Sequence, residues 1–261
     1  MSRETGRLTV LHLSDVHVTR SGRLYGRVDG AARLAAVAQY VRDAGITPEV
    51  VVVTGDLIER GNADAYDIVR RGLDELERAA GCPVFTVLGN HDDADAARIL
   101  RGHERGHARV ALLDDLRLLL LDSSSGALGR EQIAWARDAL REPHGSGTIV
   151  ALHHPPVASP MPTLARAGLR DGDDLLDALA GSDVRAVLAG HFHHPMSATL
   201  RGTPVSVGPS LAYHQVMDAG PDCVSGHDQA MFSLVHLVPG GVAATSVSLD
   251  SPDPLFTSRI A

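Results

Sequence analysis

Polar side chains of the types that bind metal ions follow five apolar segments of this 261-residue chain. Each segment is a short, nearly continuous run of aliphatic residues, which is typical of a strand buried on both faces. The carboxyl ends of strands in an α/β sheet meet at one edge, where ligands bind. We therefore expect one site to collect seven side chains: Asp15, His17, Asp56, Asn90, His153, His191 and His193.

This set of side chains indicates two metal ions rather than one. It combines imidazole, carboxylate and one amide oxygen without thiolate, a mixture that suits Zn, Mn or Fe and has too much nitrogen for Ca. One ion takes three or four protein ligands, whereas two ions that share a bridging carboxylate would use all seven. Such a pair, typically ~3.5–4 Å apart, stabilises a displacement at phosphorus and lowers the pKa of bound water.

Metal-activated hydroxide is the nucleophile that the sequence best supports. The chain contains no G-x-x-x-x-G-K-[ST] loop to cradle phosphates and no G-x-S-x-G turn to present a catalytic serine. The expected reaction is therefore hydrolysis at phosphorus by water that a metal ion has activated.

Hydrophobic periodicity predicts the elements that must position these side chains. Strands and amphipathic helices alternate at first, as in a parallel sheet, and hairpins follow later. The expected strands cover residues 8–13, 50–54, 84–88, 110–113, 116–121, 148–152, 184–189, 197–200, 204–207, 230–238 and 242–249. One expected helix follows the N-cap residue Asp29, and the others cover 64–80, which stops at Gly81, 129–140 and 173–180.

We infer an α/β fold in which two mixed sheets pack face to face with helices on both outer sides, a four-layer α/β/β/α sandwich. A single domain covers residues 1–250, because no linker-like segment divides it, and residues 251–261 form a C-terminal tail. Segments 155–170 and 208–228 have little periodicity, so we expect irregular loops that form the rim of the site.

Composition limits the partners of the chain. A formal charge of −8 argues against a nucleic-acid polymer as ligand, and no apolar run approaches the length of a membrane span. The N-terminus is short and polar without the apolar core of a signal peptide, and the only cysteines are Cys82 and Cys223. These features predict a cytoplasmic protein that acts on a small molecule. The β-rich carboxyl-terminal third could supply the edge of a homodimer.

Five short motifs resemble, in order, the complete signature of the calcineurin-like metallophosphoesterases. They are Asp15-x-His17, Gly55-Asp56, Gly89-Asn90-His91-Asp92, His153 and Gly190-His191-x-His193. The resemblance spans about residues 8 to 250 and implies the same α/β/β/α sandwich. It implies that one metal ion is held by Asp15, His17, Asp56 and His193. It also implies that Asp56 bridges to a second ion, completed by Asn90, His153 and His191.

The same resemblance implies that His91 is not a metal ligand. It would contact the scissile phosphate, together with Asn90, and protonate the leaving oxygen. This role suits histidine, because a general acid needs a pKa near neutrality.

Finer features resemble the class III cyclic-nucleotide phosphodiesterases of actinobacteria. They include Arg23-Leu24-Tyr25-Gly26, Leu152-His153-His154-Pro155-Pro156 and Pro204-Val205-Ser206-Val207. The resemblance implies hydrolysis of 3′,5′- or 2′,3′-cAMP, with glycerophosphodiesters or related small phosphodiesters as the alternative substrates. Glu59 stands where purple acid phosphatases carry a metal-binding tyrosine, which argues against that branch. A metal-free binding scaffold is a third reading, but it predicts gaps in the ligand set, and the set has none.

Other polar residues near the motifs have less defined roles. His154 and His194 flank predicted ligands, and for each a substrate contact and a scaffold role both stay open. Asp92 is expected to be a helix N-cap, and His12 a core or supporting contact. The loop from Arg20 to Arg27 is expected to be solvated rather than a phosphate clamp. Five further histidines are expected to be plain surface or loop residues: His103, His107, His144, His227 and His236.

Overall fold

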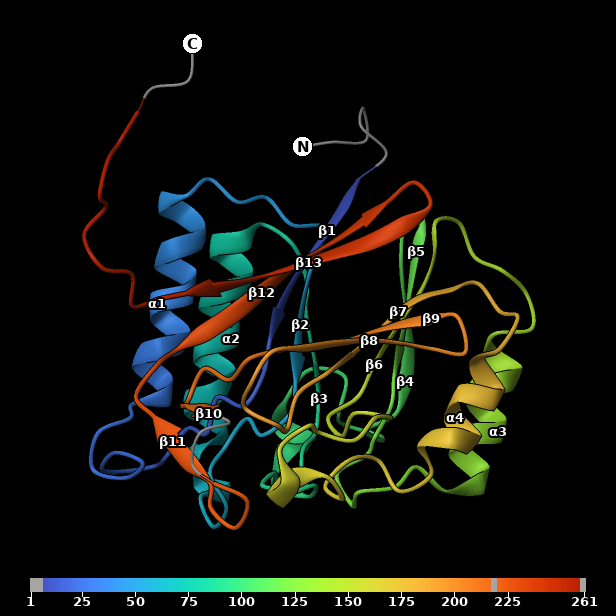
Figure 1. The fold of residues 1–261 in the computed structure, drawn as a ribbon. Helices are drawn as coiled ribbons and strands as arrows, with labels where there is room; N and C mark the ends of the chain where they lie inside the picture. The colour runs from blue at the N-terminus through green and yellow to red at the C-terminus, as the bar shows by residue number, and fades with distance from the viewer. Residues whose placement is uncertain (1–6, 217–219, 259–261) are drawn as a thin grey trace.

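Two large β-sheets lie face to face in the computed structural model, which describes residues 7–216 and 220–258 (Figure 1). One sheet has five strands in the order β13-β12-β1-β2-β3, and the other has six in the order β4-β5-β6-β7-β9-β8. Both sheets are mixed. In the first, β1, β2 and β3 are parallel, and the antiparallel pairs are those of β12 with β1 and with β13. The second has a parallel centre and an antiparallel strand at each edge. Helices α1 and α2 cover the outer face of the first sheet, and α3 and α4 that of the second (Figure 1). The expected four-layer α/β/β/α sandwich is confirmed.

The elements agree closely with those expected from periodicity. The helices are α1 (Gly30–Asp43), α2 (Tyr66–Ala80), α3 (Gly129–Ala139) and α4 (Gly172–Leu179), with short 3₁₀ turns η2 (Ala63–Ala65), η3 (Ala96–Ile99) and η4 (Pro162–Leu164). The strands are β1 (Leu8–Leu13), β2 (Val50–Thr54), β3 (Val84–Val87), β4 (Arg109–Leu113), β5 (Leu116–Leu120), β6 (Gly147–Ala151), β7 (Val184–Ala189), β8 (Met196–Leu200), β9 (Thr203–Val207), β10 (His214–Val216), β11 (Ser225–His227), β12 (Met231–Val238) and β13 (Gly241–Ser248).

Strand periodicity explains why the sheets stack. Neighbouring residues of a strand point to opposite faces, so Leu11 packs toward α1 and α2 while Val10 packs between the two sheets. In the second sheet, Val150 likewise faces α3 and α4, and Ile149 faces the first sheet. Burial on both faces therefore requires the continuous apolar runs that the sequence contains.

The helix boundaries follow from specific end residues. The side chain of Asp29 accepts a hydrogen bond from the backbone N–H of Ala32, 3.0 Å away, and caps α1 as expected. Helix α2 ends at Gly81, whose φ of 68° is the left-handed conformation that glycine adopts most easily. Asp29 thus sets where α1 begins, and Gly81 sets where α2 ends before the chain enters β3.

The structure corrects the expectation for segment 208–228. Its described part contains a two-stranded hairpin of β10 and β11, in which His214 pairs with His227. Three-residue strands are too short for periodicity to reveal, and residues 217–219 lie outside the described part of the chain. Segment 155–170 is irregular apart from the turn η4, as expected.

One histidine expected at the surface is buried. His103 is fully buried, and its Nε2 atom lies 2.8 Å from the hydroxyl oxygen of Thr86 on β3. Its Nδ1 atom lies 2.9 Å from Nδ1 of His107. The surface expectation for His103 was wrong because this pairing joins residues whose proximity depends on the turn at η3.

The described residues include further details that bear on earlier expectations. Cys82 and Cys223 are both free. Among residues 7–216 and 220–258, no helix combines the length and the apolar character that a membrane crossing requires. The predicted polar start and the end of the predicted tail include residues 1–6 and 259–261, which lie outside the described residues.

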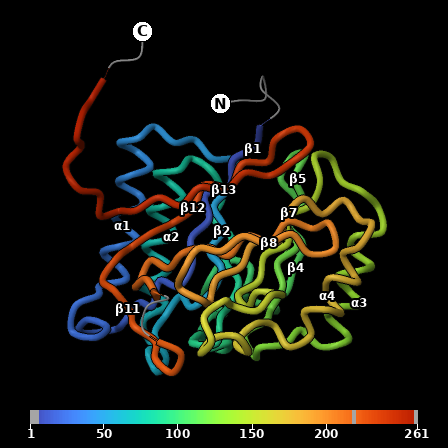
Figure 2. Tube along the Cα trace, in the orientation of Figure 1, coloured from blue at the N-terminus to red at the C-terminus, as the bar shows by residue number. Residues whose placement is uncertain are grey.

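The carboxyl ends of the central strands gather at one end of the molecule. The loops after β1, β2, β3, β6 and β7 meet there, together with the β10–β11 hairpin, at the lower end of the views in Figures 1 and 2. Strands from both sheets therefore deliver their following residues to one place.

Candidate metal centre

Four of the seven predicted ligands form a compact buried group. Asp15, His17, Asp56 and His193 each offer one donor atom, and these atoms all lie within 4.8 Å of one another. All four side chains are buried, although they follow three different strands of two sheets. This is the set that the sequence assigned to one metal ion.

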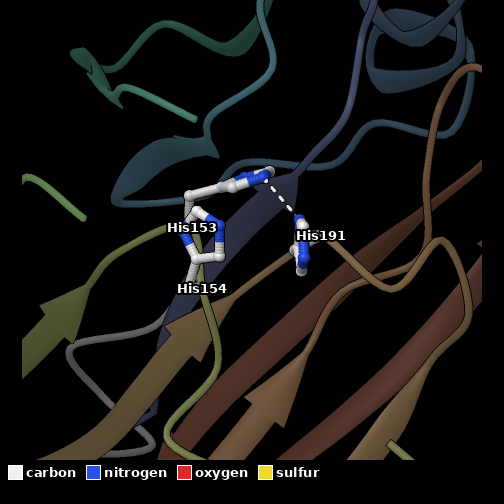
Figure 3. Close-up of side chains that lie close together, drawn as sticks. All are labelled: His153, His154 and His191. Atoms are coloured by element: carbon white, nitrogen blue, oxygen red, sulfur yellow. Dashed lines mark hydrogen bonds between the residues drawn. The ribbon is translucent and has the colours of Figure 1, made fainter. Parts of the chain in front are cut away.

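The other predicted ligands lie beside this group. Nε2 of His153 is 3.2 Å from Oδ1 of Asn90 and 3.1 Å from Nδ1 of His191. Figure 3 shows the rings of His153 and His191 meeting at this contact. The carboxylate of Asp56 reaches both groups, because Oδ2 is 3.5 Å from Nε2 of His17 and Oδ1 is 3.5 Å from Nε2 of His153. Asp56 thus has the position that a bridging ligand requires.

The donor atoms fit metal ions. Oδ1 of Asp15 is buried and has no hydrogen-bond partner among the described residues, and Nε2 of His193 lies 3.2 Å from it. Nε2 of His17 faces Nε2 of His193 at 3.3 Å. A buried acceptor without a donor is costly, and a cation between these atoms would satisfy it. The geometry therefore fits the expected metal centre.

Burial also holds the imidazoles in the neutral state that binds metals. It lowers the pKa of His17 to about 4 and that of His191 to about 2, so both imidazoles are neutral at pH 7. Neutral imidazole is the form that ligates. Burial, followed by the nearby Asp15 carboxylate, raises the pKa of Asp56 well above its usual range. A bound cation would reverse that effect by offsetting the repulsion between the carboxylates.

Contacts behind the imidazoles aim them at the centre. Nδ1 of His17 lies 2.8 Å from Oε2 of Glu59, and Nδ1 of His153 lies 2.7 Å from the carbonyl oxygen of Thr54. Nδ1 of His193 lies 3.2 Å from the carbonyl oxygen of Tyr213. Each ring can donate from Nδ1 to its acceptor and leave Nε2 free for a metal, the usual arrangement for metal-binding histidine.

The backbone around the centre is strained. Eight non-glycine residues in the described part of the chain have positive φ, and five of them are predicted ligands: Asp15, His17, Asp56, His191 and His193. Such conformations are unfavourable for residues with a side chain and persist only where surrounding structure holds them. Here the backbone N–H of Asp15 donates to the carbonyl of Gly55, and that of His17 donates to the carbonyl of Asp56.

His91 lies at the edge of the centre. Its side chain is 26% exposed, and its ring centroid is 4.8 Å from that of His17. Nδ1 lies 3.2 Å from Oε1 of Glu59, and the backbone N–H donates to Oδ1 of Asp56. Partial burial lowers the pKa of His91, although the Glu59 carboxylate acts in the opposite direction.

Glu59 is the functional residue that the sequence did not reveal. Its two carboxylate oxygens contact different histidines, Oε2 with His17 and Oε1 with His91. Burial would raise its pKa, but hydrogen bonding and charge from His17 lower it, so the side chain is anionic. The available signal was its position three residues after Asp56, in a loop that also carries a predicted metal ligand.

A comparison with protein-family models matches residues 8–195 to the calcineurin-like phosphoesterases. The chain belongs to this family. The match covers every predicted metal ligand and His91, so the resemblance expected from the five motifs is confirmed.

Curated relatives of this phosphoesterase span nearly the same length. The cAMP/cGMP dual specificity phosphodiesterase MT0825 of Mycobacterium tuberculosis is 35% identical, over 95% of this chain and 81% of the relative. A probable cyclic nucleotide phosphodiesterase of Rhodococcus erythropolis is 37% identical, over 92% of this chain and 83% of the relative. The glycerophosphodiester phosphodiesterase GpdQ of Enterobacter lignolyticus is 30% identical, over 80% of this chain and 79% of the relative.

Solved structures agree on the fold. A dimetal phosphatase from Danio rerio superposes with a TM-score of 0.60 at 16% identity, and the match covers 93% of this chain and 99% of the other. At this identity the likeness concerns the fold alone.

The phosphoesterase does not use Asp92 as a helix N-cap. The Asp92 carboxylate accepts hydrogen bonds from the backbone N–H groups of Leu57, Ile58 and Gly89 and from the hydroxyl of Tyr66. The expectation of an N-cap was wrong because the carboxylate bonds across to the loop after β2 rather than to the amides that follow it. Asp92 thereby ties the Asn90 loop to the Asp56 loop.

The three remaining histidines near the centre have different surroundings. His154 is buried, with its ring centroid 4.3 Å from that of His191, and it forms a close group with His153 and His191 (Figure 3). His194 is buried and stacks on Phe192, and its Nε2 atom lies 3.4 Å from the hydroxyl oxygen of Ser159. His12 is a core residue, as expected, with Nε2 2.9 Å from the hydroxyl oxygen of Thr54.

Proposed function

We propose that this chain is a two-metal phosphodiesterase that hydrolyses cyclic nucleotides to nucleoside monophosphates. The observation that carries the proposal is the position of Asp56 between two groups of donor atoms, His17 on one side and His153 on the other. Two curated relatives at 35% and 37% identity bear the names of cyclic-nucleotide phosphodiesterases, which supports this substrate class.

The predicted ligands divide into two sets in this proposal. Asp15, His17, Asp56 and His193 would hold one ion, and Asp56, Asn90, His153 and His191 would hold the other. Mn, Fe and Zn all suit these donors. When bound, such ions activate water and offset the negative charge that develops on the phosphoryl oxygens.

His91 would act as the general acid. A proton on the ring atom that faces the substrate passes to the leaving oxygen as the phosphorus–oxygen bond breaks, which converts an alkoxide into an alcohol. Glu59 holds the opposite nitrogen, so the donating nitrogen points into the centre. Asn90 and His91 would also orient the phosphate, with His154 and His194 as further substrate contacts.

A second candidate function is hydrolysis of glycerophosphodiesters. The named relative from Enterobacter lignolyticus, at 30% identity, favours it. The loops at 155–170 and 208–228 form the rim in either case, and their shape would select the substrate. The single catalytic domain over residues 1–250, the cytoplasmic location and the homodimer stay predictions.

An assay of metal-loaded protein on four diesters tests the proposal. We expect turnover of bis(p-nitrophenyl) phosphate and of 3′,5′-cAMP or 2′,3′-cAMP that exceeds turnover of glycerophosphoethanolamine, and we expect loss of all activity in chelator. Preferred hydrolysis of the glycerol diester would support the second candidate. No turnover of any substrate after reconstitution with Mn, Fe or Zn would overturn both.

A further inference from the structure

A tight hairpin presents the ring of Tyr25 next to Tyr213, which packs on the predicted ligand His193. Leu24 and Val28 pair through two backbone hydrogen bonds of 2.9 Å, and Tyr25 and Gly26 form the turn with φ of 52° and 70°. Three residues lie between Leu24 and Val28, and the backbone N–H of Arg27 also donates to the carbonyl of Leu24 at 3.1 Å, so Tyr25 and Gly26 are the central residues of the turn. A turn in which both central positions need positive φ favours Asn-Gly. A bulky tyrosine is unfavourable there, and its ring is 74% exposed. Neither helix packing nor core formation accounts for this residue.

The exposed ring continues inward to the metal ligands through a second tyrosine. The ring centroids of Tyr25 and Tyr213 are 5.6 Å apart in an edge-to-face arrangement. The ring of Tyr213 lies 4.1 Å from that of His193, and the carbonyl oxygen of Tyr213 lies 3.2 Å from Nδ1 of His193. The two tyrosines thus form an aromatic wall that begins at a predicted ligand and leads outward.

This wall borders a hollow of about 470 Å³, within the size range of small-molecule sites. Gln215 also lines the hollow and is 8% exposed, and its Oε1 atom has no hydrogen-bond partner among the described residues. Asp228 on the far side is held by ion pairs with Arg27, at 3.4 Å, and with Arg33. The hollow therefore combines aromatic faces, one unsatisfied neutral amide and a carboxylate whose charge is already offset.

We propose that this hollow binds the nucleobase of the substrate, with the base against Tyr25 and its polar edge toward Gln215. The inference rests on the proposed function, because the phosphate must sit at the metal centre for its substituent to meet Tyr213. Every nucleobase is planar and gains binding free energy when it stacks on an aromatic ring. A glycerol group has no planar face and cannot stack in this way. A cationic head group would gain from an unpaired negative charge, but Asp228 is already paired with two arginines.

Titration calorimetry on the metal-loaded protein tests the proposal without any catalytic step. The probes are AMP, ribose 5-phosphate and phosphocholine, which share the phosphate and differ in its substituent. We expect AMP to bind about 5- to 150-fold more tightly than ribose 5-phosphate, the range that stacking of one base on an aromatic residue contributes. Phosphocholine should bind no better than ribose 5-phosphate.

Substitutions at Tyr25 and Gln215 then test whether these side chains contact the base. Tyr25→Asn removes the ring but keeps a residue that tolerates positive φ. It should lower the ratio of AMP affinity to ribose 5-phosphate affinity about tenfold. Tyr25→Phe should retain the preference. Gln215→Met, which keeps the length of the side chain without its amide, should also weaken AMP. Trp135→Ala removes an exposed ring on α3 and serves as the control that leaves the preference unchanged.

The outcomes separate this inference from the proposed function. If bis(p-nitrophenyl) phosphate is hydrolysed but cyclic nucleotides are not, the proposed function fails, while the ratio of AMP to ribose 5-phosphate affinity still decides the subsite. An equal affinity for the two probes, an unchanged ratio in Tyr25→Asn, or tighter binding of phosphocholine would overturn the subsite. A change in oligomeric state in Tyr25→Asn with an unchanged ratio would assign the ring to a protein interface instead.

Discussion

Glu59 and His91 show how one carboxylate can serve two imidazoles of different function. Oε2 of Glu59 meets the predicted ligand His17 at 2.8 Å, and Oε1 meets His91 at 3.2 Å. The first contact turns Nε2 of His17 toward the centre, and the second leaves the other nitrogen of His91 for the substrate. In the proposed function, the orientation of one ligand and the transfer of a proton would therefore depend on the same side chain.

Replacement of His91 tests its role as the acid. His91→Ala should lower turnover by ~10²–10⁴ because the leaving oxygen would depart without a proton. Metal content should stay intact, since His91 lies outside the predicted ligand set. Rates measured on diesters with good and poor leaving groups, alongside elemental analysis, check this expectation. An equal loss for both kinds of leaving group would contradict it.

Replacement of Glu59 tests positioning. Glu59→Gln should lower kcat by about 10–100-fold, the usual effect of losing a contact behind a ligand. The Glu59 carboxylate raises the pKa of His91, so its removal should lower that pKa and move the alkaline limb of the kcat–pH profile to lower pH. Glu131→Gln on the exposed face of α3 is the control. A profile with an unchanged alkaline limb would assign Glu59 a structural role only.

At the scale of elements, the loops after β2 and β3 approach too closely for ordinary side chains. A Cβ atom on Gly89 would lie 2.2 Å from Oδ1 of Asp56, although the φ of Gly89 is not positive. Glycine is therefore required at position 89 by its close approach to the Asp56 carboxylate, the predicted bridging ligand. The Asp92 carboxylate holds the same two loops together, because it accepts hydrogen bonds from the backbone N–H groups of Leu57 and Ile58.

Gly89→Ala should therefore damage the centre more than the fold. We expect the free energy of unfolding to fall by about 1–3 kcal/mol, the usual cost of overpacking. Metal content after purification should fall with it, because Asp56 must move. Gly106→Ala is a matched control, since a Cβ there meets no atom within 4 Å and its φ is not positive. Full metal content in Gly89→Ala, measured by elemental analysis, would refute this reading.

At the scale of the whole molecule, buried neutral histidines link folding to pH. Burial lowers the pKa of His103 to about 3, His17 to about 4 and His154 to about 3. Below the ordinary value of 6.5, the unfolded chain binds protons that the folded chain does not. Stability is therefore present above pH 6.5 and is lost as pH falls toward these folded values.

His103 allows a test of this coupling away from the metal centre. The free energy of unfolding should fall between pH 7 and pH 5 in the unsubstituted protein. In His103→Gln it should fall by about 2 kcal/mol less, because the lowered pKa of His103 no longer contributes. Denaturant unfolding of metal-free protein at the two pH values measures this, with the exposed His227→Gln as control. The same pH dependence in the His103 variant and the unsubstituted protein would show that His103 does not contribute.

Local patterns account for much of this protein, and for particular reasons. The apolar runs at Leu8–Leu13 and Val50–Thr54 are buried on both faces, so composition alone identifies them as strands. Asp29 caps the start of α1 and Gly81 the end of α2, and each contacts only residues a few positions away. The burial of His103 and the β10–β11 hairpin were missed, because both depend on how distant or very short segments meet.

The sequence by itself determined the strands of the two large sheets, the types of the seven candidate ligands and the family, since these depend on residue order and short motifs. Only the tertiary structure decided that Glu59 joins His17 to His91, that Asp92 fastens two loops, and that Tyr25 borders a hollow beside His193. The physical reason is that hydrophobic periodicity reports which face of an element is buried. The direction of a polar side chain depends instead on residues that are distant in the sequence. Packing brings such residues together, as it brings β12 next to β1.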